Sequence, residues 1–461
     1  MTPTDVLLSL CYVVAAALFI LCLRGLSGPL TARRGLVLGE VGMLIAIVGT
    51  LLHKDIVRYD WILGGLVLGS AIGIGISAWI PMTKMPERIA FSHAFGGLAT
   101  ALVGVAEYVR VGSDLTHFKM GALGFEVYLG FLTFTASLMA YAKLQGLIHG
   151  APITYKGQNF VNLAMFVGTL LLLGYLIYDP AHPPLFFAIC AMGLIVGVTG
   201  VLPIGGADMP VVISLNNSYA GLAACATGFA LGSQILIISG ALDGASGLLL
   251  SILMSKAMNR SFANILFGAF GTDIAPSQQT AITKAYNEAT VEDAGAVLKA
   301  SQSVIFIPGY GMAVSQAQHA VRDLAASLER RGVDVKYAIH PVAGRMPGHM
   351  NVLLAEANVP YEKLFDLDDI NDAFARTDAV VVVGANDVVN PAAKKDPSSP
   401  IYGMPVFNVE QSRSVIVLKR SMNPGFSGVE NELFFQPNTM MVLGDAKKTL
   451  LSMIGELKEG H

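Results

Sequence analysis

Long apolar stretches separated by short polar turns fill the first 270 residues of the chain. A helix needs about 20 apolar residues to cross a bilayer. Nine stretches approach this length, at about 5–24, 35–52, 60–80, 87–109, 120–142, 158–178, 185–203, 209–231 and 234–256. The pattern therefore predicts a polytopic α-helical membrane domain of about nine transmembrane helices, and the odd number puts its two ends on opposite sides of the membrane.

A different pattern begins near residue 271, where the apolar runs become short. Thr290 and Asp293 have the spacing of a capping box at the start of a helix. A buried-strand run at 303–308, a helical pattern at 315–330 and a second strand at 333–340 follow at the spacing of a βαβ unit. This order predicts a C-terminal α/β Rossmann-like domain.

Charge is divided in the same way. Charged residues occupy 24 of the first 270 positions and 39 of the remaining 191. This division excludes a soluble single-domain protein, a disordered chain and a strongly basic nucleic-acid binder. We predict a transmembrane domain at 1–260, a linker at 261–289 and a nucleotide-binding domain at 290–461. The four cysteines lie inside apolar runs without CxxC spacing, so no metal site is expected.

Loop charges predict the orientation of the membrane domain. With the N-terminus outside, nine Lys and Arg residues lie in the inner loops and four in the outer loops. Basic residues concentrate on the cytoplasmic side of membrane proteins. We therefore expect the C-terminal domain in the cytoplasm, or in the matrix if the membrane belongs to an organelle.

Small residues recur three or four positions apart on three predicted spans. They are Gly65, Gly69 and Gly73, then Gly193 and Gly197, then Gly240, Gly244 and Gly247. Such faces let helix backbones approach closely, so we interpret them as packing faces. Proximity to a water or proton path is the alternative.

Polar residues at membrane depth are costly and are therefore candidates for function. His93 and Asn217 lie at similar depths in the fourth and eighth spans, so their side chains could meet if these spans are neighbours. Histidine protonates near neutral pH, which suits a proton relay, but a packing role is equally open. Glu126 and Asp208 are further candidates, although Asp208 could simply cap the next helix. The role of Asp243 stays undecided.

A glycine turn connects the predicted strand at 303–308 to the following helix. Its residues are Gly309, Tyr310, Gly311, Met312, Ala313 and Val314. Glycine lets a backbone approach a pyrophosphate, and a helix N-terminus offers unpaired N–H groups. Val314 replaces the third glycine of the usual dinucleotide fingerprint, so the match is imperfect. The strand–turn–helix–strand context nevertheless favours a dinucleotide site.

The ends of two strands discriminate between cofactors. NAD sites usually place a carboxylate about 20 residues after the glycines, whereas the second strand here ends in Ile339-His340-Pro341. The strand at 415–418 runs into Lys419 and Arg420, which could receive a 2′-phosphate. This favours NADP over NAD. A solvated charge pair at a strand end is the alternative.

Three more turns follow apolar segments. They contain Arg345, then Gly384, Asn386 and Asp387, then Gly425. Ligands of open α/β sheets bind outside the carboxyl ends of the strands, where these turns fall. Arg345 could reach a phosphate and Asp387 could lie near the nicotinamide, or either could stabilise its own turn.

Four longer segments resemble one family. They are PGYGMAVSQAQ at 308–318, HPVAGRMPGHMNVLLAEA at 340–357, GANDVVNPAA at 384–393 and KRSMNPGFSGVENELFF at 419–435. Together they resemble the beta subunit of the proton-translocating NAD(P) transhydrogenase. The likeness covers the whole chain, including SHAFGGL around His93, LNNSYAG around Asn217 and KAMNRSF at Arg260.

The resemblance implies hydride transfer between NAD(H) and NADP(H), coupled to proton movement across the inner membrane of a bacterium. It implies NADP(H) on the C-terminal domain, with the turn at Gly309–Val314 at the pyrophosphate, Lys419 and Arg420 at the 2′-phosphate, and Arg345 and Asp387 near the cofactor. It also implies His93 and Asn217 in the proton path with Glu126 and Asp208 as accessory members, and Arg260 at the junction with the domain.

The family pattern is not matched everywhere. The family commonly carries a tyrosine in the loop after the Lys-Arg pair, where this chain has Phe426, and Asn423-Pro424-Gly425 is a stiffer turn. No second glycine fingerprint with a trailing carboxylate is present, so NAD(H) is expected on a partner. The resemblance implies alpha subunits that carry the NAD(H)-binding domain and further transmembrane helices, and a dimer of the whole assembly.

Two other functions compete with this interpretation. A transporter or channel with a redox-sensing nucleotide domain would need a substrate pathway, but the spans show neither inverted halves nor a filter repeat. Such a sensor would usually bind NAD, which the missing carboxylate disfavours. A membrane-anchored NADP-dependent reductase acting alone would need less membrane than nine spans.

Overall fold

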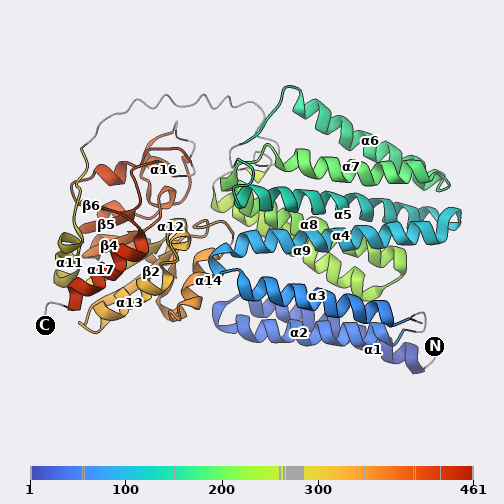
Figure 1. Ribbon diagram of the computed structural model, residues 1–461, viewed down its shortest axis with the longest axis horizontal. Helices are drawn as coiled ribbons and strands as arrows, with labels where there is room; N and C mark the ends of the chain where they lie inside the picture. Colours follow the sequence, from blue (N-terminus) through green and yellow to red (C-terminus); the bar gives the residue numbers. More distant parts are fainter. Residues whose placement is uncertain are drawn as a thin grey trace. The chain divides into compact units, whose positions relative to one another are not determined.

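The computed structural model describes residues 3–458 except 54, 55, 57, 150, 151, 259, 260, 263, 264, 266–284, 347, 398, 400 and 426. The chain folds into two compact units, one helical and one α/β (Figure 1). The predicted coupling residue Arg260, most of the predicted linker and Phe426 lie outside the described residues.

The helical unit contains nine long helices among the described residues. They are α1 (Pro3–Leu26), α2 (Pro29–Leu51), α3 (Asp60–Trp79), α4 (Met85–Val111), α5 (His117–Leu144), α6 (Gln158–Tyr178), α7 (Pro183–Val201), α8 (Met209–Leu231) and α9 (Gln234–Ala257). Each predicted apolar stretch overlaps one of them. Eight are long and apolar enough to cross a membrane. The exception is α8, because Asn216, Asn217 and Ser218 interrupt its apolar sequence.

The glycine faces pack as predicted on two helices. A Cβ atom added to Gly197 of α7 would lie 2.3 Å from the carbonyl oxygen of Leu132 in α5. On Gly240 of α9 it would lie 2.4 Å from the backbone nitrogen of Cys225 in α8. Only glycine permits these approaches.

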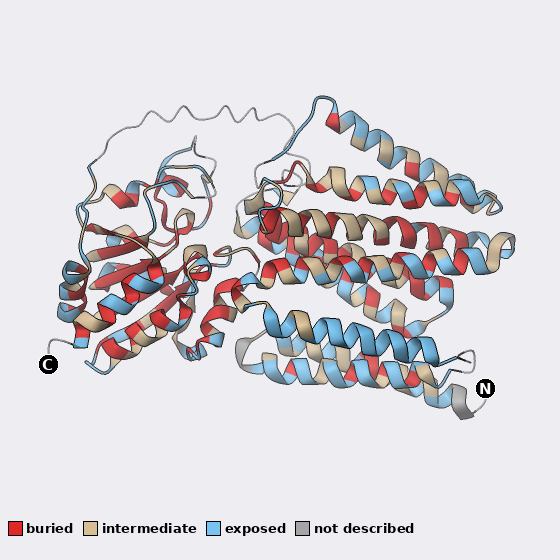
Figure 2. Cartoon of the chain, in the orientation of Figure 1, coloured by how far each residue is buried: buried red, intermediate tan, exposed pale blue. Residues whose placement is uncertain are grey.

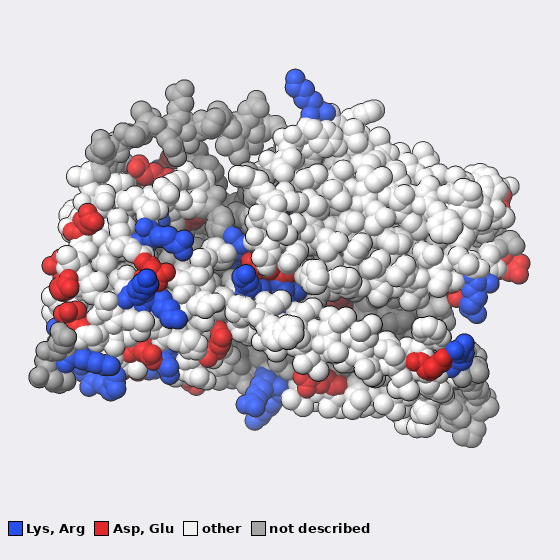
Figure 3. Space-filling model, viewed as in Figure 1, with Lys and Arg blue, Asp and Glu red and all other residues white. Residues whose placement is uncertain are grey.

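The predicted packing face of α3 has no neighbour among the described residues of this chain. A Cβ atom on Gly65, Gly69 or Gly73 would meet nothing within 4 Å. No residue of α3 is buried, and Figure 2 shows the helix as almost entirely exposed. On the face drawn in Figure 3, charged side chains are almost absent from the helical unit between the helix ends, as expected for a surface that contacts lipid.

The α/β unit is built on a parallel sheet of six strands. They are β1 (Ser303–Pro308), β2 (Asp334–Ile339), β3 (Leu364–Asp366), β4 (Ala379–Val383), β5 (Ser414–Lys419) and β6 (Thr439–Leu443). Their order in the sheet is β3-β2-β1-β4-β5-β6. This is the order of a dinucleotide-binding fold, with the topological switch point between β1 and β4. The predicted Rossmann-like fold is confirmed.

Helices cover one face of the sheet and mainly short helical turns cover the other. Val304 and Phe306 of β1 pack in a core with α11 (Val291–Ala300), α13 (Gln318–Glu329), α14 (His349–Glu356) and α17 (Ala446–Lys458). Ile305 and Ile307 point to the opposite core, which contains Phe374 and the helical turn Glu432–Phe435. Strands buried on both faces explain the continuous apolar runs in the sequence.

The helix predicted at 315–330 is interrupted near its start. Most of the predicted glycine turn is itself a short helix, α12 (Tyr310–Val314), which follows Gly309, and α13 begins only at Gln318. Gln316 between them has a φ of 52°, a left-handed conformation that ends α12. The capping box is confirmed, because the Thr290 hydroxyl accepts a bond from Asp293 N–H and the Asp293 carboxylate accepts one from Thr290 N–H.

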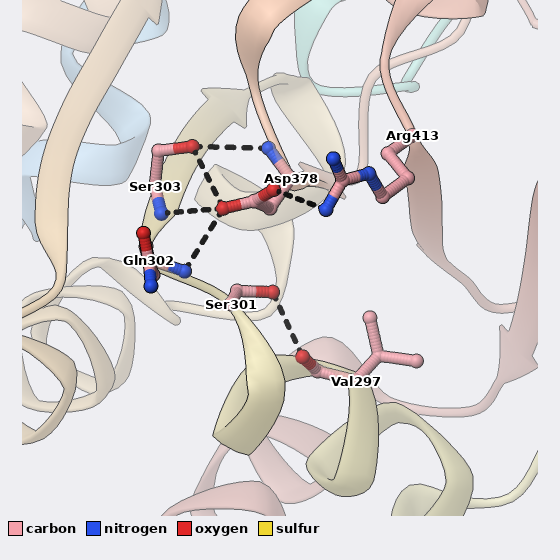
Figure 4. A network of polar contacts seen from close by, with 6 residues as sticks. All are labelled: Val297, Ser301, Gln302, Ser303, Asp378 and Arg413. Atoms are coloured by element: carbon pink, nitrogen blue, oxygen red, sulfur yellow. Dashed lines mark hydrogen bonds and ion pairs between the residues drawn. The ribbon is translucent and has the colours of Figure 1, made fainter.

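One carboxylate ties the start of β4 to the start of β1 (Figure 4). Asp378 Oδ2 accepts hydrogen bonds from the backbone N–H groups of Gln302 (2.9 Å) and Ser303 (3.2 Å) and from the Ser303 hydroxyl (3.2 Å). The guanidinium of Arg413, largely exposed, lies 2.9 Å from Oδ1. These bonds, with the Gln302 N–H first, hold the pKa of Asp378 below its usual value.

We expect Asp378→Ala to weaken the attachment between the starts of β1 and β4 by about 2 kcal/mol, because two backbone donors lose a charged acceptor. Hydrogen exchange of the peptides that contain β1 and β4 measures the loss. Because the pKa of Asp378 is lowered in the folded state, its carboxylate stabilises the fold at a pH above the pKa of the unfolded chain. This stabilisation is lost as the pH falls below about 4, so the difference in stability between the parent and Asp378→Ala should shrink there. Arg413→Ala, which removes only an exposed ion pair, should cost less than about 1 kcal/mol. Equal losses for both variants would contradict this account.

Candidate functional site

The turns after β1 and β4 meet at the switch point of the sheet. Gly309 N–H donates to the carbonyl of Val383 (2.9 Å), and Gly311 N–H donates to the carbonyl of Gly384 (2.8 Å). Gly384 N–H in turn donates to the carbonyl of Leu418 at the end of β5 (3.1 Å). Three strand ends are therefore joined by backbone bonds, at the position where open α/β sheets bind ligands.

Glycine is required in these turns by backbone contact as well as by any ligand. A Cβ atom on Gly309 would lie 2.4 Å from Ala385 Cα, and one on Gly384 would lie 2.4 Å from Gly311 Cα. Gly384 also has a φ of +63°. Met312 and Ala313 are buried in the core, so only their backbone can face a ligand, whereas the Val314 side chain is exposed.

Arg345 and Tyr310 lie together, although they come from different turns. The Arg345 guanidinium stacks 4.2 Å from the centre of the Tyr310 ring. The Arg345 backbone N–H donates to Nδ1 of the buried His349 (3.1 Å). Burial, together with the charge of Arg345, lowers the pKa of His349 to about 4, so this histidine stays neutral and can accept that bond. The turn after β2 therefore brings a cation to the glycine turn after β1.

The loop after β5 is bonded to the turn after β4. The Ser427 hydroxyl donates to Asp387 Oδ1 (2.6 Å), and its backbone N–H donates to Oδ2 (3.2 Å). The Asn431 amide donates to the backbone and side-chain oxygens of Asn386, each at 3.0 Å. Gly425 fits here because a Cβ atom would lie 2.7 Å from the Asn386 amide nitrogen.

Sequence reasoning missed Ser427 and Asn431. The signal available was the long polar run after Lys419 and Arg420, but the pairing with Asn386 and Asp387 depends on the adjacency of β4 and β5. Burial raises the pKa of Asp387, while the two bonds from Ser427 and the charge of Lys419 oppose this rise. Asp387 therefore acts as the hydrogen-bond acceptor that holds the loop after β5 against the turn after β4.

Lys419 and Arg420 differ in their surroundings. Lys419 is half-buried, and its ammonium group donates to the carbonyl of Asn423 and lies 4.8 Å from the centre of the Phe434 ring. Burial lowers the pKa of Lys419 to about 8, and the carboxylate of Asp387 opposes this shift. Arg420 is exposed. Lys419 is thus positioned by the loop, and Arg420 is open to a ligand.

The site combines glycine turns and cations at the carboxyl ends of four strands. Arg345 follows β2, Lys419 ends β5 and Arg420 comes next, so positive charge comes from two different turns. Such a set suits an elongated polyanion such as a dinucleotide. Among the described residues, no group of three or more His, Cys, Asp or Glu side chains could hold a metal ion.

A second polar site lies within the helical unit. The Asn217 amide of α8 donates to Asp243 Oδ1 of α9 (2.9 Å). Asp243 also interacts electrostatically with His93 of α4, whose buried Nε2 has no hydrogen-bond partner among the described residues. Asp243, whose role the sequence left open, thus interacts with both Asn217 and His93.

The other two predicted membrane residues are placed differently. Glu126 of α5 is fully buried, and neither of its carboxyl oxygens has a hydrogen-bond partner among the described residues. A Cβ atom on Gly104 of α4 would lie 2.9 Å from its Oε1. Gly104 is eleven positions after His93, or about 16 Å along α4. Glu126 therefore lies beside α4 at a different depth from His93. Asp208 is buried in a helical turn (Gly206–Asp208) just before α8.

A buried lysine, counted among the loop charges in the sequence, belongs to the helical unit. The Lys143 ammonium at the end of α5 donates to the carbonyls of Val201 (3.2 Å), Leu202 (2.6 Å) and Ile204 (2.6 Å). Val201 is the last residue of α7, Leu202 is its C-cap and Ile204 follows two residues later, and a helix end leaves its last carbonyls without partners in its own helix. Lys143 therefore caps α7, and sequence alone did not distinguish it from a solvated loop residue.

The chain is similar to one family of known proteins along almost its whole length. The family model described as NAD(P) transhydrogenase beta subunit matches residues 8–456. The NAD(P) transhydrogenase subunit beta of Rhodospirillum rubrum is 48% identical over 452 residues, which cover 95% of this chain and 96% of the relative. The protein of the same name from a defined strain of that species matches with the same identity and coverage.

Proposed function

Because the chain belongs to the NAD(P) transhydrogenase beta subunit family, we propose that it is the NADP(H)-binding and proton-translocating subunit of such an enzyme. The enzyme would transfer hydride between NAD(H) and NADP(H) and couple this to proton movement across the membrane. The observation that carries the proposal is the joining of the β1, β4 and β5 ends into one cationic, glycine-rich site within a chain that matches the family almost from end to end.

The NADP(H) site would lie at the switch point of the sheet. The backbone of Gly309 to Val314 would face the pyrophosphate, with Arg345 close by through its stacking on Tyr310. Lys419 and Arg420 would bind the 2′-phosphate, since both stand at the end of β5. Asp387 would act near the nicotinamide through the loop that Ser427 fixes. The bound nicotinamide supplies the hydride chemistry, so the protein needs only to bind and orient it.

The NAD(H) site would lie on another polypeptide. A beta subunit implies an alpha subunit as partner, and the family uses NADP(H) and NAD(H). Direct hydride transfer needs the two reacting carbons about 3–3.5 Å apart, so the partner's NAD(H) domain would have to dock on this site. We expect alpha subunits with additional transmembrane helices, a dimer of the assembly, and a bacterial inner membrane with the N-terminus outside and the α/β unit in the cytoplasm.

The proton path would run through the helical unit, with His93 and Asn217 at its centre and Glu126 and Asp208 as accessory members. The linker would relay protonation to the nucleotide site. Its described end supports this, because Met441 of β6 and the segment at 287–289 exchange backbone hydrogen bonds of 2.8 and 3.0 Å. Strand β6 pairs with β5, which ends in Lys419. A His93→Asn variant that kept hydride transfer and proton pumping coupled would contradict the relay.

The first test is the dependence of hydride transfer on the partner. Proteoliposomes that contain this chain and the alpha subunit should transfer hydride from NADPH to an NAD analogue, because the two nucleotide sites lie on different chains. The chain alone should bind NADPH and transfer nothing. Absorbance of the reduced analogue measures the rate. Reduction of a small substrate by the chain alone would favour the solitary reductase and contradict the proposal.

The second test uses the titration of Lys419. Its pKa is lowered to about 8, so its positive charge is lost as the pH rises through that value. We expect the affinity for NADPH to fall about tenfold between pH 7 and pH 9, because a 2′-phosphate loses a charged partner. NADPH fluorescence titrations of the full chain measure this. Lys419→Arg, which stays charged, should remove the fall. An equal fall in both proteins would exclude Lys419 as the titrating group.

A further inference from the structure

The contact between α8 and α9 is unusually close, and a carboxylate lies beside it. A Cβ atom on Gly221 of α8 would lie 2.3 Å from the backbone nitrogen of Gly244 and 2.9 Å from the carbonyl carbon of Asp243. The Ser218 hydroxyl donates to the carbonyl of Gly244 (2.7 Å). Asn217 is one helical turn from Gly221, so the glycine crossing brings its amide to Asp243.

Asp243 lies near the middle of an apolar helix. It is nine residues from the start of α9, about 13 Å along the axis, and α9 is long and apolar enough to cross a membrane. A carboxylate at this depth costs several kcal/mol in hydrocarbon unless it is paired, and such residues usually mark ion or proton pathways. Asp243 is exposed at the surface of the described chain, so packing by neighbouring residues does not shield its carboxylate.

Two side chains from two other helices, α8 and α4, interact with the Asp243 carboxylate. Asn217 donates one hydrogen bond to Oδ1 at 2.9 Å. Among the charged groups of the described residues, His93 of α4 is the one that acts electrostatically on Asp243. His93 Nε2 is buried and has no hydrogen-bond partner in the part of the chain that the structure describes. A neutral imidazole presents one nitrogen as an acceptor, so His93 can take up a proton with a carboxylate nearby.

We propose that Asp243 is the anionic partner of His93 in the proton path, held in place by Asn217. When the imidazole takes up a proton, the imidazolium and the carboxylate offset each other's charge within the membrane. When the proton leaves, the amide of Asn217 still satisfies one oxygen of the carboxylate. Asp243 is thus a positioning and charge-balancing residue, and the inference rests on the proposed proton path.

The test compares four variants in proteoliposomes that also contain the alpha subunit. The change in lumen pH measures proton translocation, and the rate of hydride transfer is followed at the same time. Asp243→Asn keeps a side chain that can bond Asn217 but removes the charge, so we expect proton translocation to fall about tenfold. Asp243→Glu keeps the charge and should recover much of the rate. The double variant Asn217→Asp with Asp243→Asn exchanges the two groups and should recover part of it. Ser246→Ala, on the same helix, removes only a bond to the carbonyl of Leu242 and should leave the rate unchanged.

The outcomes separate a charge role from a structural one. A purely structural Asp243 would tolerate Asp243→Asn, because an amide still bonds Asn217, and parental translocation in that variant would overturn the inference. NADPH binding by each variant shows that the chain is folded. If Asp243→Asn does not fold, failure of both Asp243→Glu and the exchanged pair to translocate protons would also overturn the inference. A parent without proton movement would instead contradict the proposed function itself.

Discussion

Direct contact between glycine and a neighbouring backbone is the constraint on which both polar sites depend. In the α/β unit, Gly309 and Gly311 lie against Gly384 and Ala385, and this contact joins the ends of β1 and β4. In the helical unit, Gly221 lies against Gly244, which brings Asn217 to Asp243. At both places a Cβ atom would overlap backbone atoms, which cannot move away as a flexible side chain can. The glycines therefore determine which polar groups can meet.

Much of the fold could be predicted from the sequence because its signals are local. The strand at 303–308, the capping box at Thr290 and the nine apolar segments each depend on neighbouring residues, and all have counterparts in the structure. The failures involve partners distant in the chain. Gly69 has the spacing of a packing face but no neighbour in the described residues. Lys143 reads as a loop charge until the carbonyls at the end of α7 are placed around it.

The candidate site shows the same division. The glycine turn and the Lys419-Arg420 pair could be recognised from their positions after apolar strands. Ser427 could not, because its partner Asp387 lies forty residues away and meets it only since β4 and β5 are neighbours. The sequence showed that Asp243 is a charged residue at membrane depth, but its hydrogen-bond partner became clear only from the crossing of α8 and α9. In physical terms, the sequence shows which polar groups cost free energy when they are buried, and the fold shows which hydrogen bonds and charges compensate for that cost.

Coupling between proton movement and nucleotide binding is the central claim of this account. Protonation in the helical unit has to change the affinity of a site in the α/β unit, which is a linkage between two sites. The most direct measurement follows lumen pH and hydride transfer together in proteoliposomes that contain this chain and the alpha subunit. The account predicts that hydride transfer builds a pH difference, and that an uncoupler abolishes this difference and accelerates the transfer. Hydride transfer without any change in lumen pH, and without a response to the uncoupler, would contradict it.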